Sequence, residues 1–183
     1  RRQRQMCIRD SVMRQTSARL PWLLIGMLGG IGNSMILGNF DTTFAAHPEM
    51  ALYIPLIGGT GGNVGTQSSA IIVQGLANSS LDAKDTFKQV AKEAVVAVIN
   101  ATIISLLVYI YNFIRFGATA TVTYSVSISL FAVVMFASIF GTLVPMTLEK
   151  LKVDPAIATG PFISITNDII GMMLYMGITV LLS

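Results

Sequence analysis

Five long apolar segments, separated by short polar stretches, dominate the pattern along the chain. They cover about residues 20–40, 50–77, 90–113, 122–148 and 156–182. Each reaches the roughly 20 residues that a helix needs to cross about 30 Å of hydrocarbon. Because lipid offers no hydrogen-bond partners to a free backbone, each segment must be helical within the membrane. The pattern predicts an all-α integral membrane protein with five transmembrane helices.

Local chemistry agrees with several of these boundaries. Pro21 suits the first turn of the first helix, and His47-Pro48 marks the start of the second. Asp154 followed by Pro155 is typical of an N-cap with proline at the first helical position. The segment 81–92 is amphipathic, so we expect it to lie at the membrane interface before the third span.

Lysine and arginine are distributed unevenly between the two sides of the membrane. With the N-terminus in the cytoplasm, only Arg115 falls on the outer side. The cytoplasmic side beyond residue 11 holds Arg14, Arg19, Lys84, Lys88, Lys92, Lys150 and Lys152. The positive-inside rule therefore predicts a multi-pass protein of the cell (inner) membrane with a cytoplasmic N-terminus and an outer C-terminus. Residues 1–19 form a cytoplasmic lead-in segment, and residues 20–183 form the transmembrane domain.

The first residues have an unusual composition. The string RRQRQMCIRDS at residues 1–11 resembles translated sequencing-adapter sequence, so it is a candidate non-native leader. The chain begins with arginine rather than methionine, and we expect it to be a fragment of a longer protein. No predicted span or site residue lies within residues 1–11.

Composition narrows the classes of function. Hydrophobic residues make up 53% of the chain and charged residues 11%, against roughly 25% charged in a typical soluble domain. The lipid bilayer is therefore the expected partner, and the net charge of +3 has no polar surface on which to bind nucleic acid. A single cysteine (Cys7) and a single histidine (His47) disfavour a disulfide, a thiolate metal site and Ser/His catalysis. We do not expect an enzyme.

Asp168 is the one acidic residue that lies far from a predicted helix end. It is about twelve residues into the fifth span, roughly 18 Å from the cytoplasmic end. A charged carboxylate at that depth costs about 2.5–3.5 kcal/mol on insertion scales, so it is a functional candidate by default. A protonated aspartate that makes a helix–helix hydrogen bond is the alternative.

Small and polar residues share a helical face with Asp168. The face consists of Gly160 or Pro161, Ser164, Asp168, Gly171 and Tyr175, whereas the other faces carry bulky apolar side chains. We therefore predict Gly160, Pro161 and Gly171 as pore-lining residues. Small stripes are also common where membrane helices pack closely.

The second span contains the string GGTGGNVGTQSS at residues 58–69. Five glycines in eight residues cost about 1 kcal/mol each relative to alanine, which predicts a glycine-interrupted helix. Irregular backbone is tolerated in a membrane only where it is buried in protein or lines a wet cavity. Gly62 falls near the depth of Asp168. Close helix packing remains the alternative, and the absence of a GxxxxGK[ST] pattern disfavours a phosphate site.

The two unusual segments together favour a divalent cation. Glycines expose backbone carbonyls, and further oxygens come from the side chains of Asn63, Thr66, Gln67 and Ser69. Oxygen ligands suit hard cations such as Mg²⁺. One carboxylate is a poor match for a doubly charged ion, but a twofold homodimer with its axis along the pore supplies two.

Three motifs resemble the membrane domain of MgtE-type Mg²⁺ channels. They are GGTGGNVGTQS at 58–68, VDPA at 153–156 and PFISITNDIIG at 161–171, and the resemblance extends over about residues 14–183. The resemblance implies a homodimer whose ion path is lined chiefly by the second and fifth helices. It implies Mg²⁺ as the transported ion and Asp168 as its central ligand. It also implies cytoplasmic N and CBS regulatory domains in the full-length protein, which this chain lacks.

The resemblance extends to further positions. The predicted metal set comprises Asp168, Ser164, Gly59, Gly62, Asn63 and Thr66, with Ala70 also lining the path. Asp154 and Glu93 are candidate acids at the cytoplasmic mouth. Thr66 and Gly160 stand where some relatives have asparagine, which affects the expected selectivity and inner constriction.

Other functions remain open on the sequence alone. A Na⁺-coupled Mg²⁺ exchanger is the alternative within transport. An intramembrane proton relay or enzyme built on Asp168 would need a second acid, a nucleophile–base pair or a histidine at the same depth, and the sequence predicts none there. A purely structural anchor leaves the matching depths of Asp168 and the glycine string unexplained.

Overall fold

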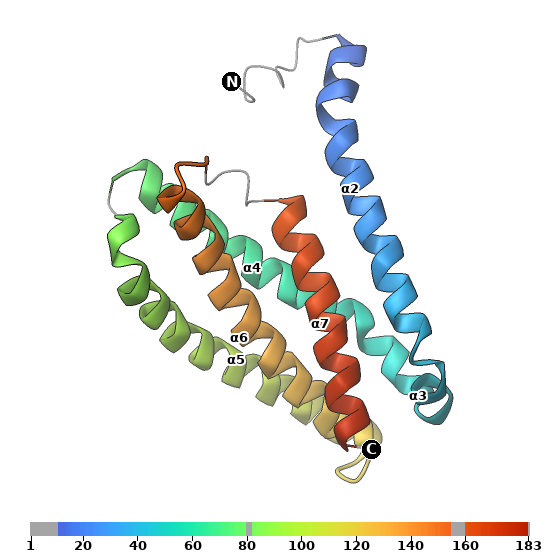
Figure 1. Cartoon of the computed structure of the whole chain (residues 1–183). Coiled ribbons are helices and arrows are strands. Elements are labelled where there is room, and N and C mark those ends of the chain that lie inside the picture. The colour runs from blue at the N-terminus through green and yellow to red at the C-terminus, as the bar shows by residue number, and fades with distance from the viewer. Residues whose placement is uncertain (1–10, 80–81, 155–159, 183) are drawn as a thin grey trace.

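The computed structural model describes residues 11–79, 82–154 and 160–182, apart from the side chains of Ala83 and Pro161. Within these ranges it contains helices and no strand, so the predicted all-α class is confirmed (Figure 1). The elements in chain order are α2 (Val12–Gly38), α3 (Asp41–Ala46), η1 (Pro48–Tyr53), α4 (Ile54–Ala77), η2 (Ala83–Asp85), α5 (Thr86–Phe116), α6 (Thr121–Lys150) and α7 (Pro161–Leu182).

Four of the described helices, α2, α5, α6 and α7, are long and apolar enough to cross a membrane. The helix α4 has 24 residues, which is also enough length. It is not among the four candidate spans, and the glycine string and its polar neighbours lie within it. The described part of the chain thus has four candidate spans and one further helix of spanning length.

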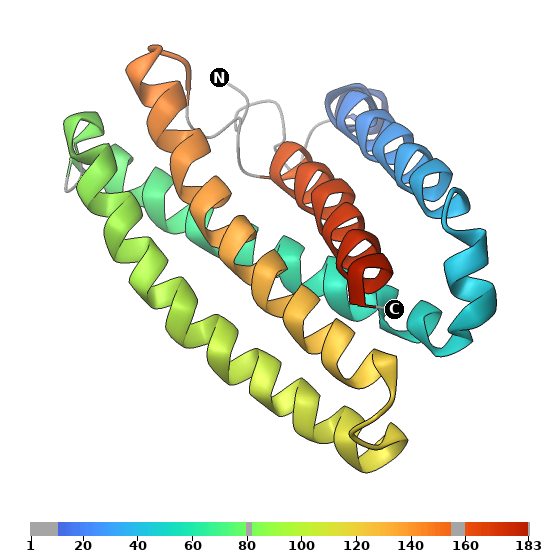
Figure 2. The ribbon, with the colours of Figure 1, turned by 60° about the horizontal axis from the view of Figure 1, so that its bottom comes forward.

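Helix α6 lies at the centre of the bundle. It contributes many buried residues and packs against α5, α4 and α7 (Figure 2). Helix α2 stands at the edge, packs chiefly on α7 and has no buried residue. The bundle therefore consists of a core of four helices with α2 laid against one side.

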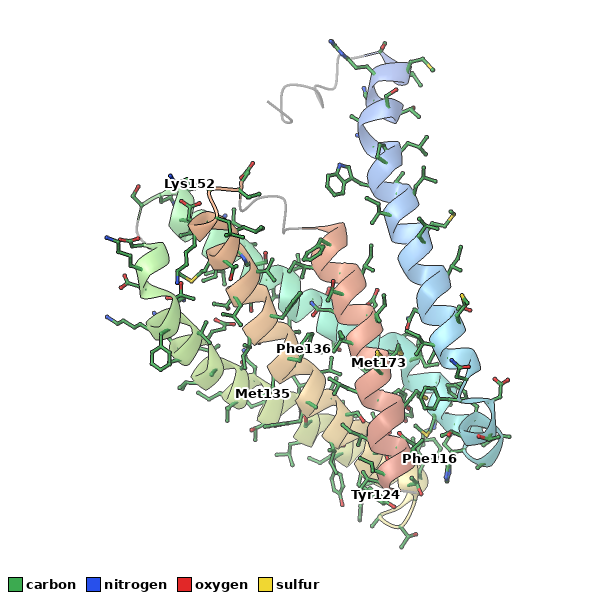
Figure 3. The ribbon with its side chains drawn as sticks, viewed as in Figure 1. Phe116, Tyr124, Met135, Phe136, Lys152 and Met173 are labelled. Atoms are coloured by element: carbon green, nitrogen blue, oxygen red, sulfur yellow. The ribbon has the colours of Figure 1, made fainter. Side chains whose placement is uncertain are left out.

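Two tyrosines anchor the segment that leads into α4. Tyr175 on α7 donates a hydrogen bond from its hydroxyl to the carbonyl oxygen of Met50, over 2.8 Å. Tyr53 donates to the side-chain oxygen of Asn112 on α5. Both contacts lie in the main hydrophobic cluster, toward the end of the bundle where Figure 3 labels Phe116 and Tyr124. They fix η1, and with it the start of α4, against two neighbouring helices.

The glycine string does not interrupt its helix, contrary to the prediction from sequence. Helix α4 runs unbroken from Ile54 to Ala77. A side chain at Gly65 would overlap the amide of Asn167, and a Cβ at Gly61 would lie 2.7 Å from Cγ1 of Val133. The close approach of α6 and α7 thus stabilises the helix and offsets the low helix propensity of glycine.

Two predicted boundaries at the N-terminal sides of spans were wrong. Helix α2 begins at Val12 rather than near residue 20, so Pro21 lies inside it instead of in its first turn. The hydroxyl of Ser11 caps this earlier start by accepting a hydrogen bond from the N–H of Arg14, over 3.4 Å. The third helix, expected from about residue 90, begins at Thr86 and therefore includes part of the amphipathic segment 81–92.

The remaining boundaries agree better. Helix α6 (Thr121–Lys150) covers the predicted fourth span at 122–148. Pro48 opens η1, which leads into α4. The predicted cap at Asp154-Pro155 involves residues outside the described ranges, which resume at Gly160.

Gly65→Ala should lower the melting temperature of the detergent-solubilised protein. The added methyl group must displace the Asn167 amide, and overpacking of this kind costs about 1–3 kcal/mol. Gly59→Ala is the matched control in the same helix, because an added Cβ there meets nothing within 4 Å. The control should melt at or above the wild-type temperature, and equal melting of both variants would contradict the proposed role of Gly65 in packing.

Candidate functional site

A cavity of about 420 Å³ lies between α2, α4 and α7. Most of its lining comes from α4 and α7, with one residue from α2. The lining residues are Asn33, Ile54, Pro55, Gly58, Gly59, Gly62, Asn63, Thr66, Ser164, Asp168 and Met172. The cavity is therefore lined by glycine backbone and by side chains that carry oxygen.

The pairing of α4 with α7 places the cavity beside Asp168. The two helices run in opposite directions (Figure 1). Residues later in α4 therefore lie beside residues earlier in α7. A Cβ at Gly58 would lie 3.4 Å from Oδ1 of Asp168, and a Cβ at Gly62 would lie 3.8 Å from Oγ of Ser164. Because these glycines have no side chains, the carboxylate and the hydroxyl remain open to the cavity.

Asp168 is partly buried and has no protein partner in the described part of the chain. No hydrogen bond or ion pair joins its carboxylate to another described residue. A helix–helix hydrogen bond by a protonated aspartate, the alternative raised by the sequence, is therefore not observed among these residues. A carboxylate left unpaired within a membrane helix is costly, which favours an external cation as its partner.

Asn167 fixes the rotation of α7 about its axis. Its side chain is buried, and Nδ2 donates to the carbonyl oxygen of Gly61 over 3.5 Å. Adjacent residues on a helix point about 100° apart. Because this hydrogen bond holds Asn167 of α7 against α4, the next residue, Asp168, is turned toward the cavity instead of the bundle core.

The donor set suits a hard cation that keeps its water. Neutral oxygens come from the side chains of Ser164, Asn63 and Thr66, and Asp168 adds one negative charge. No group of three His, Cys, Asp or Glu side chains comes together among the described residues. Mg²⁺ dehydrates reluctantly and often binds proteins through its hydration shell, so such a sparse and roomy site can hold it.

The structure brings all six predicted metal residues together. Asp168, Ser164, Gly59, Gly62, Asn63 and Thr66 line the same cavity. Of the other predicted pore-lining residues, Ala70 is exposed on α4 and does not contribute to this cavity. Gly171 is buried near Val133 and Ile57, on the side of α7 that faces the bundle.

The remaining predicted residues lie elsewhere. Gly160 precedes α7 with φ of +106°, a conformation that favours glycine. Pro161 begins α7, and its side chain is outside the description. Glu93 accepts a hydrogen bond from Ser68 over 2.7 Å, between α5 and α4, and Asp154 is exposed. Gly160, Glu93 and Asp154 do not line the cavity.

Five lining residues were not predicted from the sequence: Asn33, Ile54, Pro55, Gly58 and Met172. Gly58 belongs to the glycine string, and Met172 follows Asp168 by one helical turn, so periodicity could have identified both. Asn33 is a polar residue inside an apolar span. That signal was present in the sequence, but nothing there placed α2 beside α7.

Comparison with known proteins gives one matching family and several similar relatives. The family model MgtE, described as divalent cation transporter, matches residues 54–178. The chain is 34% identical over 160 residues to the magnesium transporter MgtE of Bacillus subtilis, an alignment that covers 87% of this chain. It is 33% identical over 165 residues to the magnesium transporter MgtE of Thermus thermophilus, covering 90%.

These relatives are much longer than the chain. The two alignments cover 35% of the Bacillus protein and 36% of the Thermus protein. A third similar protein, the magnesium transporter MgtE of Enterococcus faecalis, is 26% identical over 171 residues, which make up 38% of its length. The similarity therefore concerns about a third of each relative.

Asp168→Asn should abolish most of the increase in melting temperature that Mg²⁺ causes. A ligand that binds only the folded state stabilises it by about 2.7 kcal/mol at a concentration one hundred times its Kd. Removing the only carboxylate among the described lining residues weakens that binding. Asp82→Asn, which changes an exposed carboxylate, should keep the wild-type response. A full Mg²⁺ response in Asp168→Asn would argue against a cation site at this residue.

Proposed function

The chain belongs to the MgtE family of divalent cation transporters, and we propose that it forms a transmembrane pore for Mg²⁺ with Asp168 at the central ion site. One observation carries the proposal: the carboxylate of Asp168 faces a cavity lined by glycines and has no partner among the described residues. A passing cation would supply the missing positive charge. Mg²⁺ enters this proposal as the transported substrate.

The size of the cavity supports passage of a hydrated ion. Six waters in octahedral coordination occupy about 180 Å³ at the volume of liquid water. The cavity of about 420 Å³ has room for such an ion. Waters bound to a cation point their hydrogens outward, so the oxygens of Asp168, Ser164 and Thr66 can accept hydrogen bonds from the shell. If the pore recognises Mg²⁺ through its hydration shell, the ion keeps its waters and the cost of dehydration is avoided.

Charge balance and exposure support a homodimer. One chain supplies one carboxylate to a doubly charged ion, and a twofold axis beside α4 and α7 would supply a second Asp168. Asn63, Thr66 and Gln67 are exposed on α4 although they lie in the middle of a membrane helix. Polar side chains rarely face lipid. A second copy of the chain against this face would shield them and enclose the ion path.

If α4 also spans the membrane, the chain crosses it five times and its two ends lie on opposite sides. The end of the bundle that carries Lys152 also holds the α4–α5 connection with Lys84, whereas Phe116 lies at the opposite end (Figure 3). The excess of basic residues at the Lys152 end supports a cytoplasmic location for that end. The protein is then a multi-pass protein of the cell (inner) membrane, with its N-terminus inside and its C-terminus outside.

The greater length of the relatives supports further domains in the full-length protein. We expect these to be the cytoplasmic N and CBS domains implied by the sequence resemblance, with a regulatory role on the pore. No observation on the described residues favours a Na⁺-coupled exchanger over passive permeation, so permeation is the function we put forward.

Asp168→Ala should reduce Mg²⁺ flux into proteoliposomes at least tenfold, since a loss of about 1.4 kcal/mol of ion stabilisation corresponds to a factor of ten. Mg²⁺ entry would be followed with an entrapped Mg²⁺-sensitive dye. Asp82→Ala serves as the control and should conduct normally. Undiminished flux in Asp168→Ala would refute the central ion site, and a requirement for an opposing Na⁺ gradient would replace permeation with exchange.

The proposed dimer can be tested separately by mixing wild-type and Asp168→Ala chains. If both Asp168 carboxylates are needed in one pore, flux should fall with the square of the wild-type fraction when wild-type and Asp168→Ala chains are co-expressed. The fraction of each chain is measured by mass spectrometry on the purified mixture. A linear fall would show that each chain conducts on its own.

A further inference from the structure

Helix α2 lies close against α7 at Gly29. A Cβ at this position would overlap the side chain of Ile165 on α7, so only glycine permits the observed distance between the two helices. Most other parts of α2 are exposed, and the helix has no buried residue. The Gly29–Ile165 contact therefore fixes how α2 lies against α7.

This contact brings Asn33 to the depth of Asp168. The two helices run in the same direction (Figure 1). Asn33 follows Gly29 by four residues, about 6 Å along α2, and Asp168 follows Ile165 by three residues, about 4.5 Å along α7. Both steps return to the same helical face. Accordingly, Asn33 and Asp168 line the same cavity.

The carboxamide of Asn33 has an unused acceptor. Its Oδ1 has no hydrogen-bond partner within the described part of the chain and is closed off from water, so the carboxamide must rotate to turn this oxygen toward the cavity. A buried polar atom without a partner is unfavourable, and that rotation would relieve the cost. Packing of α2 does not require a polar residue at this position, because the neighbouring contact is made by a glycine and an isoleucine.

We propose that Asn33 is a further ion-path residue, which accepts a hydrogen bond from the hydration shell of the cation at Asp168. The inference rests on the proposed function, because it needs a hydrated cation in the cavity. In this proposal α2, α4 and α7 together build the ion site, and Asn33 of α2 supplies a neutral oxygen in addition to the carboxylate of Asp168. The residue then contributes to the affinity for the divalent cation.

The test compares Asn33→Ala and Asn33→Asp with Ser34→Ala in the full-length protein, reconstituted in proteoliposomes. The measured quantity is the Mg²⁺ concentration that gives half-maximal flux. Asn33→Ala should raise it about tenfold, which corresponds to about 1.4 kcal/mol, because one hydrogen bond to the hydration shell is lost. Asn33→Asp should lower it, because a second carboxylate attracts the cation. Ser34 is exposed on α2 and does not line the cavity, so Ser34→Ala should match the wild type.

Opposite shifts in the two variants distinguish an ion contact from a packing role, which would impair both. The Mg²⁺-induced increase in melting temperature should change in the same two directions, and it reports binding without flux. If both Asn33 variants match the wild type while Asp168→Ala is inactive, the role of Asn33 is refuted and the proposed function stands. If Asp168→Ala conducts normally, the proposed function and the role of Asn33 fail together.

Discussion

The structure depends on an acidic side chain that lies within a membrane helix and finds no counter-charge in the described part of its own chain. Such a group is unfavourable in lipid unless a cation visits it. The surroundings of Asp168 are arranged so that this visit is possible. Gly58 and Gly62 leave the space open, Ser164 adds a second oxygen, and the Asn167–Gly61 hydrogen bond keeps the carboxylate turned toward the cavity.

The glycine string serves two faces of one helix. Gly61 and Gly65 let α4 pack against Val133 of α6 and Asn167 of α7, whereas Gly58 and Gly62 border the cavity. At about 100° per residue, the two pairs lie about 60° apart around the helix axis, on neighbouring strips of its surface. Close packing and a polar cavity are therefore both present along the same string.

Helix α2 shows how a weakly packed element can still take part in a site. It has no buried residue and packs chiefly on α7, yet the Gly29–Ile165 contact aligns it with the ion cavity. Its loose packing also implies that small movements relative to α7 are less costly than movements of α6, whose many buried residues form the centre of the bundle. In the proposed dimer, α4 and α7 would provide the shared wall, and α2 would close the cavity on one side.

The sequence by itself determined the helical class and pointed to the principal residues of the candidate site. Long apolar segments permit only helices in lipid, and Asp168, Ser164 and the glycine string are unusual enough to be recognised without a structure. Tertiary structure decided the rest. Packing against Val133 and Asn167 kept α4 continuous where propensity predicted a break, it turned Gly171 toward the core, and it joined Glu93 to Ser68. It also brought Asn33 to the site, because helical periodicity gives the faces of each helix but not which helices meet.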